Sequence, residues 1–424
     1  MDINMQNDNS ERISKAPAEN PKAGEFQTGA SLTADSRTAG SLTNGSSNRE
    51  SQAADPRSSS SGIYDFWLSH LTFVPHRLIR EMLAFFDGDP GILFSQSPDD
   101  LLKAGFIMNL TQMEQYESFR NKDRLEELRE TYEKSGIFYA GEHEDSFPDR
   151  LRPLEDRPFG LFYKGSLPPD DCLPAGIVGS RTCTTYGREM AFFFGRELCK
   201  RGVSIISGMA LGVDGYAQKG ALASSETSSA STYAVLAGGV DICYPRENIG
   251  LYMQLSENGN GLLSEYPPGR RAMPRDFPVR NRIIAGLSDV LLVIEAAENS
   301  GSLITVNHAL SQGKDVFALP GRVGERMASG CNELLKNGAQ VLTCPEDVLQ
   351  YLGIQVKKDT PAPKKAMLSR EEKVVYECFG ADDTTVDQLL EISTFPATIL
   401  QTVLLTLEIK GLIRKTPFGG YRKV

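Results

Sequence analysis

Short runs that are apolar throughout alternate with longer amphipathic segments between residues 173 and 353. Strands that are apolar on both sides are typical of a parallel sheet that helices cover on both faces. The segments between them have the three-to-four-residue periodicity of helices. The pattern therefore predicts an α/β fold, a Rossmann-like doubly wound and mostly parallel sheet. The five expected strands are AGIVGS, VSIISG, TYAVLAG, DVLLVIEA and DVFALPG.

The sequence on either side of this core predicts smaller domains. Amphipathic stretches separated by glycines indicate a small helical domain at residues 62–135, either of the SAM or helix-hairpin-helix kind or a simple packing module. Residues 136–172 form a connector in which two β-prone runs flank a proline-rich loop. Beyond a polar linker at 354–366, three helical stretches and a glycine-centred hairpin predict a winged helix at 367–424. Its expected core is Leu404, Leu405, Leu407, Ile409 and Ile413.

The first 61 residues are rich in Ser, Ala, Thr, Asn and Gly, and their only aromatic residue is Phe26. Such a segment cannot bury enough apolar surface to offset its ordering entropy, so we expect a disordered tail. The N-terminus lacks the basic and apolar regions of a signal peptide, and no run of about 18 apolar residues follows. The seven cysteines never form a C-x-x-C pair. These features predict a cytoplasmic protein without membrane insertion.

Motifs for metal, cofactor and covalent chemistry are missing from the sequence. The four histidines have no zinc-site spacing, so no metal is expected. Neither G-x-G-x-x-G nor G-x-x-x-x-G-K-[ST] is present, which disfavours NAD binding and P-loop ATP hydrolysis. Ser180, Ser207 and Ser300 have no evident histidine base. We therefore expect a site built for binding, with no cofactor and no catalytic residues.

Positive charge is concentrated in one stretch of an acidic chain. The formal net charge is -10, yet the segment GRRAMPRDFPVRNR at 269–282 holds five arginines opposed only by Asp276. A polyanion would therefore have to bind a local patch. We expect Arg280 and Arg282 of this basic loop to line a pocket. Arg270, Arg271 and Arg275 are expected to guide the polyanion toward that pocket.

The loops that follow the expected strands are the candidate anion site, because ligands of doubly wound sheets bind beyond the carboxyl ends of the strands. Gly208 and Gly301 either approach a ligand or only satisfy tight turns. Asp214 either supports the ligand or is only a helix N-cap. Glu295, at the end of a buried strand, is expected to pair with Arg280 or Arg282, or else to contact the ligand. These loops contain Gly179-Ser180-Arg181, Ser207-Gly208, Ala237-Gly238-Gly239, Tyr244-Pro245-Arg246 and Asn299-Ser300-Gly301-Ser302.

The order and spacing of these phrases resemble the DprA/Smf family, DNA-processing protein A. The segments that resemble the family are IVGSRTCTTYG, IISGMALGVDGYAQKGAL, VLAGGVDICYPREN, LLSEYPPG, FPVRNRIIAGLSDVLLVIEA, SGSLITVNHAL, VFALPG and GCNELLKNGA. The resemblance implies a single-stranded DNA-binding recombination mediator that protects incoming strands and loads RecA recombinase during natural transformation. It also implies a homodimer formed through the α/β domain. Gln218 stands where family members usually have histidine in the phrase DGxAH, which favours binding over catalysis.

Carried over residue by residue, the resemblance assigns a DNA-binding set to the strand-end loops and the basic stretch. Bases could stack on Tyr186, Tyr244, Tyr266 or Phe277, and phosphates would meet arginines and backbone amides. The DNA-binding set that the resemblance implies comprises Gly179, Ser180, Arg181, Ser207, Gly208, Arg246, Arg280, Asn281 and Arg282. The strand-end loops add Ser300 and Gly301 to this set, with Asp214 and Glu295 as supporting residues.

Proteins of two other functional classes have a sheet of this kind, and both are alternatives for this chain. A phosphoribohydrolase-like enzyme acting on nucleotides is the main rival, although its P-G-G-x-G-T phrase is replaced here by Ser300-Gly301-Ser302. A nucleotide-sensing Rossmann protein is the third possibility. Release of free base from AMP would identify the enzyme. Binding that depends on oligonucleotide length would identify the strand binder, because a small-molecule sensor has no such dependence.

Overall fold

The computed structural model describes residues 56–224, 230–355, 368–380, 384–393, 395–410, 412–415 and 420–423. Residues 1–55 of the expected disordered tail and most of the expected linker lie outside these ranges. The first described helix, α1 (Pro56–His70), begins within the last residues assigned to the tail.

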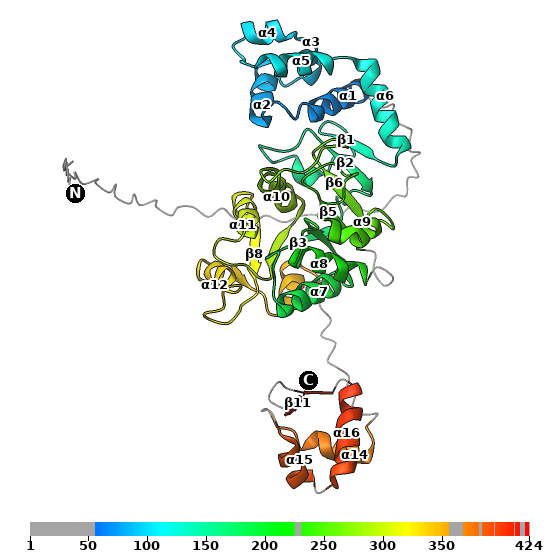
Figure 1. Cartoon of the computed structure of the whole chain (residues 1–424), viewed down its shortest axis with the longest axis vertical. Helices are drawn as coiled ribbons and strands as arrows, with labels where there is room; N and C mark the ends of the chain where they lie inside the picture. Colours follow the sequence, from blue (N-terminus) through cyan, green and yellow to red (C-terminus); the bar gives the residue numbers. More distant parts are fainter. Residues whose placement is uncertain are drawn as a thin grey trace, which may run out of the picture. The chain divides into compact units, whose positions relative to one another are not determined.

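Nine strands of the described chain form one sheet in the order β1-β2-β6-β5-β4-β3-β7-β8-β9 (Figure 1). The pairs from β6 to β9 are all parallel, whereas β1 pairs with β2 and β2 with β6 in antiparallel fashion. The strands are β1 (Phe138–Gly141), β2 (Gly160–Gly165), β3 (Leu173–Val178), β4 (Val203–Ser207), β5 (Thr232–Val235), β6 (Gly261–Ser264), β7 (Val290–Val293), β8 (Asp315–Ala318) and β9 (Gln340–Val341).

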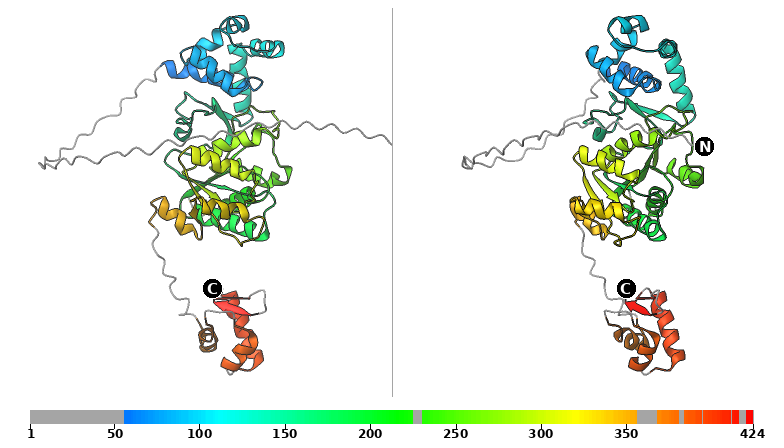
Figure 2. Two further views of the ribbon diagram at one scale, coloured as in Figure 1. Left: turned by 90° about the vertical axis from the view of Figure 1, so that its left-hand side faces the viewer. Right: turned by 60° about the vertical axis from the view of Figure 1, so that its left-hand side comes forward.

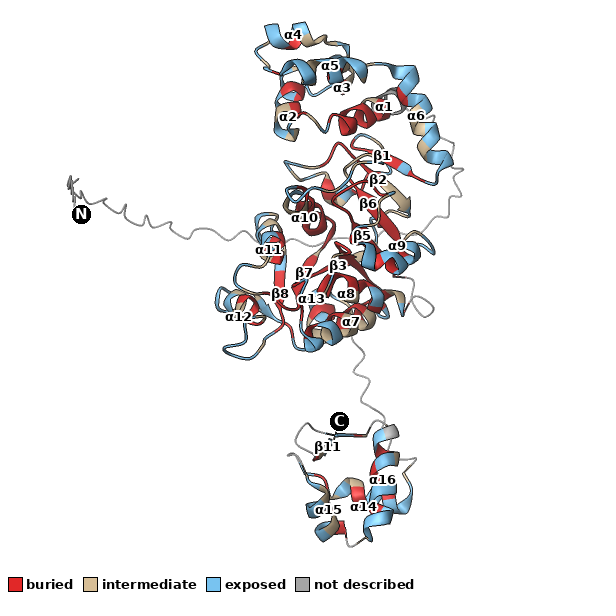
Figure 3. Cartoon of the chain, viewed as in Figure 1, coloured by how far each residue is buried: buried red, intermediate tan, exposed pale blue. Residues whose placement is uncertain are grey.

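Helices cover both faces of this sheet, as two views in Figure 2 show. Ile177 of β3 faces one core with Phe194 and Val348, and the next residue, Val178, faces the opposite core with Ile283. Both faces of each central strand are therefore buried, as the colours of Figure 3 show for the sheet, which confirms the doubly wound prediction. The helices are α7 (Thr185–Cys199), α8 (Val213–Leu222), α9 (Ile249–Leu255), α10 (Asp276–Leu287), α11 (Ser302–Ser311), α12 (Ser329–Lys336) and α13 (Pro345–Tyr351).

Four strands lie outside the five that the apolar pattern indicates. The two β-prone runs of the connector are β1 and β2, and they extend the sheet through the pairing of Phe162 with Ser264. Strand β6 is only four residues long, and β9 is two exposed residues. The apolar part of β6 is only Leu262 and Leu263, and β9 has no buried residue, so neither has the apolar run by which a buried strand is recognised from sequence.

The expected basic loop is partly a helix, because α10 begins at Asp276 and contains the phrase FPVRNR. Pro278 falls in the first turn, where the missing N–H of proline has no helical partner to lose. The Asp276 carboxylate accepts a hydrogen bond from the backbone N–H of Met273, at 2.7 Å, and forms two with Arg270. Asp276 thus ties the exposed part of the basic stretch to the helix N-terminus.

The small helical domain packs around the single tryptophan of the chain, Trp67. Its core also includes Phe66, which contacts Tyr139 and Phe162 of the β1–β2 hairpin. The amphipathic stretch at residues 110–134 forms two helices, because the Asn121 side chain accepts a hydrogen bond from Arg124 N–H and starts a new helix. The helices after α1 are α2 (His76–Phe85), α3 (Pro90–Ser95), α4 (Pro98–Lys103), α5 (Leu110–Ser118) and α6 (Lys122–Lys134).

The C-terminal domain has the expected three helices and hairpin: α14 (Arg370–Glu377), α15 (Val386–Ser393), α16 (Ala397–Ile409), β10 (Ile413–Lys415) and β11 (Tyr421–Lys423). Leu404, Leu407 and Ile413 are buried in its core as expected. The assignment of Leu405 to this core is wrong: its side chain is 58% exposed. Leu400, Val403, Leu404 and Leu407 share the buried face of α16, and the helical period places Leu405 on the opposite face. The side chain of Ile409 lies outside the described residues.

Within the described ranges, no single helix is long and apolar enough to cross a membrane. Val386–Ser393 and Ala397–Glu408 reach that length and composition only as a pair, with a bend of 113° between them.

A matched pair of leucines tests this packing. We expect Leu404→Ala to lower the stability of the winged helix by about 2–5 kcal/mol, because it leaves a cavity in the core. Leu405→Ala should change stability by less than about 0.5 kcal/mol, as for other exposed positions. Hydrogen exchange of the α16 amides in the full chain measures both effects. Equal losses of protection would show that the two side chains are packed alike.

Candidate functional site

The strand order reverses at β3, which has β4 on one side and β7 on the other. Ligands of such sheets bind at this reversal, beyond the carboxyl ends of the two strands. A cavity of about 400 Å³ lies at this place, and we call it the β3–β7 cavity. Its lining comprises Val178, Gly179, Arg181, Ala210, Asp214, Phe277, Pro278, Arg280, Asn281, Ile284, Ser300, Gly301, Ser302, Ile304 and Thr305.

Arg181 is the accessible cation of this cavity. Its side chain is exposed, and its guanidinium carbon lies 4.9 Å from the centre of the Phe277 ring. Among the described residues it forms no ion pair with a carboxylate. A guanidinium held against an aromatic face keeps its N–H edges available for an anion. Tyr244 contacts the same Phe277 ring, at 5.6 Å between centroids.

The N-terminus of α11 forms another wall of the cavity. The hydroxyls of Ser300 and Ser302 are hydrogen-bonded to each other at 2.7 Å. Gly301 is exposed, and a Cβ built on it would meet nothing within 4 Å, so the backbone here is open. Backbone N–H groups at the start of a helix favour negatively charged ligands.

Arg280 is a buried support of the loops rather than an exposed cation. Its side chain donates to the carbonyl oxygens of Gly208, at 3.0 Å, and of Val235, so it joins the loops after β4 and β5. Burial lowers the pKa of Arg280 to about 10. A Cβ on Gly208 would lie 2.5 Å from the Arg280 Nη2 atom, so this glycine is required by the close approach of the guanidinium. Asn281, next to it, is partly exposed and lines the cavity.

Asp214 is also buried, and it holds the loop after β4. Its carboxylate accepts a hydrogen bond from the Gly208 N–H at 3.2 Å. Burial raises the pKa of Asp214, and the nearby charge of Arg280 opposes that rise. The interpretation of Asp214 as the N-cap of its helix is wrong, because Gly212 occupies that position with a φ of 77°.

The expected pairing of Glu295 with Arg280 or Arg282 is wrong. The Glu295 carboxylate accepts hydrogen bonds from the backbone N–H and the hydroxyl of Thr184, at 2.8 and 2.6 Å. Because Thr184 is the N-cap of α7, Glu295 anchors the start of that helix. Arg282 pairs instead with Glu265, at 2.7 Å, and faces away from the β3–β7 cavity. Spacing along the sequence could not distinguish these carboxylate partners, which come from different loops.

The structure brings together only part of the expected set. Gly179, Arg181, Arg280, Asn281, Ser300, Gly301 and Asp214 line the β3–β7 cavity. Ser207 is buried and donates its hydroxyl to the Ile177 carbonyl at 2.6 Å, and the Ser180 hydroxyl accepts from Thr182 N–H. Gly208 lines a smaller neighbouring recess with Tyr244 and Phe277. Arg246 is exposed in the short helix η3 (Arg246–Asn248) and does not line the cavity.

Comparison with known proteins identifies the family. The model of the family described as DNA recombination-mediator protein A matches residues 139–353, and the model of the DprA winged helix domain matches residues 359–419. The chain belongs to the DNA recombination-mediator protein A family. It is therefore placed among the DNA-processing proteins of recombination and transformation.

Members of this family from several bacteria are similar to this chain over most of their length. Protein Smf of Escherichia coli is 38% identical over 282 residues, which cover 65% of this chain and 74% of that protein. The crystal structure of DNA processing protein A from Streptococcus pneumoniae, at 30% identity, covers 68% of this chain and 96% of that chain with a TM-score of 0.51. A structure of the Helicobacter pylori protein, which concerns its single-stranded DNA binding mode, is 32% identical and covers 50% of this chain and 95% of that chain, with a TM-score of 0.45.

Several lining residues of this family member carry no sequence signal of a binding site. Pro278, Ile284, Ile304 and Thr305 reach the cavity from α10 and α11. Pro278 and Ile284 are three residues from Asn281, Ile304 is four from Ser300 and Thr305 is four from Gly301, a spacing that would indicate them once both segments were recognised as helices. Of the expected stacking residues, Phe277 lines the β3–β7 cavity, whereas Tyr266 lies under Arg270, with 3.7 Å from ring centre to guanidinium. In the part of the chain that is described, no three His, Cys, Asp or Glu residues gather to hold a metal ion.

Proposed function

We propose that the β3–β7 cavity binds the sugar-phosphate backbone of single-stranded DNA, with Arg181 as its main phosphate contact. The observation that carries this proposal is the accessible guanidinium of Arg181, seated on Phe277 at the point where the strand order reverses. The same class of ligand is named for the Helicobacter pylori relative.

The chemistry of the cavity suits a single strand. The Arg181 N–H groups and the backbone at the start of α11 would hold phosphate oxygens. A base freed from stacking in a duplex could lie against the rings of Phe277 and Tyr244, a contact worth about 1–3 kcal/mol per base. Buried Arg280 would contribute positive potential and hold the loops in place without touching the strand. Because phosphate contacts carry little sequence information, binding should not depend on base sequence.

The further steps of the function stay predictions from the family resemblance. We propose that the bound strand is protected and then passed to RecA recombinase during natural transformation. We also propose that two copies of the chain associate through the α/β domain, so that two cavities act on one strand. The assignments of Arg246 and Asn281 to DNA binding likewise remain proposals, with Arg181, Ser300 and Gly301 best placed for contact. For the buried Arg280 and Arg282 we propose a supporting role in place of the direct contact that the resemblance implies.

Replacing Arg181 tests the proposal. We expect Arg181→Ala to weaken oligo-dT binding roughly tenfold or more, the value of a charge-assisted hydrogen bond. The slope of log affinity against log salt should fall by about 0.7 for the lost phosphate contact. Arg124→Ala, which removes an exposed arginine of α6 outside the cavity, is the matched control and should leave both quantities unchanged. Unchanged affinity and slope in Arg181→Ala would contradict the proposed site.

An enzyme assay separates this function from the nucleotide-acting alternative. Incubation of the purified chain with AMP should release no free adenine. Turnover that disappears in Arg181→Ala would show that the cavity is an active site and would overturn the binding function.

A further inference from the structure

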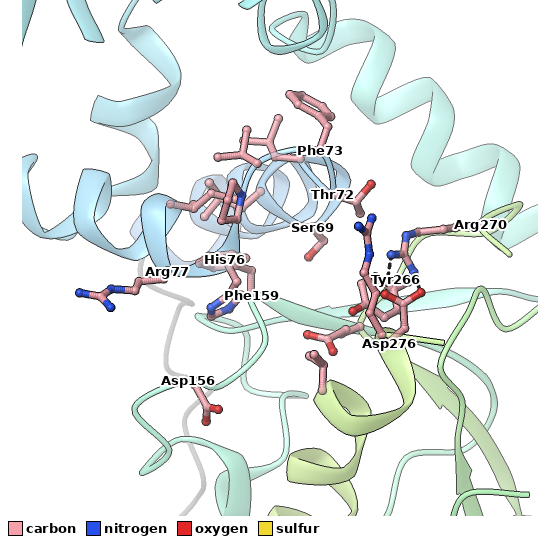
Figure 4. Close-up of a pocket in the computed structure, with 18 of the residues that line it drawn as sticks. Ser69, Thr72, Phe73, His76, Arg77, Asp156, Phe159, Tyr266, Arg270 and Asp276 are labelled. Carbon is pink, nitrogen blue, oxygen red and sulfur yellow. Dashed lines mark hydrogen bonds and ion pairs between the residues drawn. The ribbon is translucent and has the colours of Figure 1, made fainter. Parts of the chain in front are cut away.

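A second and larger cavity, of about 740 Å³, lies between the small helical domain and α10. We call it the α2–α10 cavity. In Figure 4, Ser69, Thr72 and Phe73 of the helical domain lie on one side of it, and Tyr266, Arg270 and Asp276 lie on the other. Its volume is that of a site for a nucleotide-sized ligand. No part of the function described above uses it.

The two cavities are on opposite sides of the first turns of α10. Phe277, Arg280 and Asn281 face the β3–β7 cavity, whereas Asp276, Val279 and Arg282 face the α2–α10 cavity. Pro278 lines both. The two lining sets are thus interleaved within about two helical turns, a rise of roughly 10 Å. A strand leaving one cavity could enter the other after a few nucleotides.

The charges inside the α2–α10 cavity are largely neutralised. Arg270 makes two hydrogen bonds with Asp276, at 3.0 and 3.1 Å, and Arg282 pairs with Glu265. Burial lowers the pKa of His76 to about 3, so this ring is neutral at physiological pH. The interior therefore carries little net charge, which favours an uncharged group such as a base over a phosphate.

The rim and the walls of the α2–α10 cavity offer contacts for the phosphate and the base of a nucleotide. Arg275 at the start of α10 is exposed and, among the described residues, forms no ion pair with a carboxylate, so it can meet a phosphate. The ring of Phe73 lines the cavity and is only partly buried. Tyr266, with Arg270 over one face of its ring, also lines the cavity, and the hydroxyl of the exposed residue Thr72 can bond to a base edge. A cation at the rim and aromatic walls inside fit an unstacked nucleotide, not a duplex.

We propose that the α2–α10 cavity is a second nucleotide subsite for the same single strand, reached by crossing the N-terminal end of α10. This inference rests on the proposed function of the β3–β7 cavity. It extends the strand-binding surface from the α/β domain onto the small helical domain.

Filling the cavity tests the subsite. Thr72→Trp places a large side chain in it from an exposed position, and Thr131→Trp on α6 is the matched control outside it. Fluorescein-labelled oligo-dT of about 4 and about 20 nucleotides would cover the ends of the usual range of site sizes. We expect Thr72→Trp to weaken binding of the long oligonucleotide by about tenfold, as for loss of a stacked base, and to leave the short one unchanged. Thr131→Trp should bind both as the unmodified chain does.

The outcomes separate the two proposals. If Arg181→Ala weakens both oligonucleotides and Thr72→Trp weakens neither, the β3–β7 site stands and the subsite is overturned. If Arg181→Ala has no effect, the proposed function itself fails.

Photo-crosslinking of the unmodified chain to 5-iodouracil-containing oligo-dT provides a measurement that does not depend on the folding of a variant. Crosslinks at Phe73 or Tyr266 are expected with the long strand only, and their absence contradicts the subsite. If free dTMP binds the unmodified chain, loses affinity in Thr72→Trp and does not compete with the long strand, the cavity takes free nucleotides and the strand assignment is overturned.

Discussion

Arg280→Ala is expected to destabilise the α/β domain by about 2–6 kcal/mol, as for two buried carbonyl acceptors that lose their donor. The Arg280 side chain is only 4% exposed and holds the carbonyl oxygens of Gly208 and Val235. Its loss would leave two buried acceptors unbonded and the buried Asp214 without its neighbouring positive charge. A buried acceptor left without a donor costs about 1–3 kcal/mol. Thermal unfolding of the full chain, monitored by hydrogen exchange of β4 and β5, measures the effect.

The exposed Arg271 of the same basic stretch is the matched control, and Arg271→Ala should change stability by less than about 0.5 kcal/mol. Any loss of DNA binding in Arg280→Ala should follow the loss of structure. A variant that is as stable as the unmodified chain but no longer binds oligo-dT would show instead that Arg280 touches the strand.

Acidification from pH 7.5 to pH 5 is expected to destabilise the small helical domain by on the order of 4 kcal/mol, through His70 and His76. Burial lowers the pKa of His70 to about 4 and that of His76 to about 3, and Arg282 adds to the second shift. Below the unfolded-state pKa of 6.5, the unfolded chain binds protons that the folded chain does not. This stability is therefore complete above pH 6.5 and is lost as the pH falls toward the folded-state values.

Trp67 makes the measurement specific, since it is the only tryptophan of the chain and is fully buried in the helical core. Urea unfolding followed by Trp67 fluorescence at pH 7.5 and pH 5 should show the loss of stability of the small helical domain. The double variant His70→Gln, His76→Gln should have a flatter dependence on pH. An equally steep dependence in that variant would assign the acid sensitivity to other groups.

His143 affects the dependence of stability on pH in the opposite direction to His70 and His76. Its ring is 2.8 Å from the buried carboxylate of Asp65, and this hydrogen bond raises the pKa of His143. The stability from this pair is complete below pH 6.5 and is lost as the pH rises through the raised value. Because the His143 side chain is 43% exposed, solvent weakens its effect relative to the two buried rings. His143→Gln should therefore increase the loss of stability of the small helical domain between pH 7.5 and pH 5.

Local sequence patterns predicted the elements that are buried on every side. Apolar runs such as VSIISG indicated β4 because both faces of that strand are buried. Strand β9, with two exposed residues, has no such pattern, and its place in the sheet comes only from pairing with β8. The side-chain period of a helix likewise distinguishes Leu404 from Leu405 only when the direction of the core is known.

The sequence by itself determined the doubly wound sheet, the family and the strand-end loops that hold Gly179, Arg181 and Ser300, because strand ends and glycine turns are local features. Only the tertiary structure decided what each charged side chain does. Arg280 is a buried support, Arg282 pairs with Glu265 beside another cavity, and Glu295 anchors Thr184. The physical reason is that a charge is satisfied by whichever partner the fold brings within hydrogen-bonding distance, and these partners lie 17 to 111 residues away along the chain.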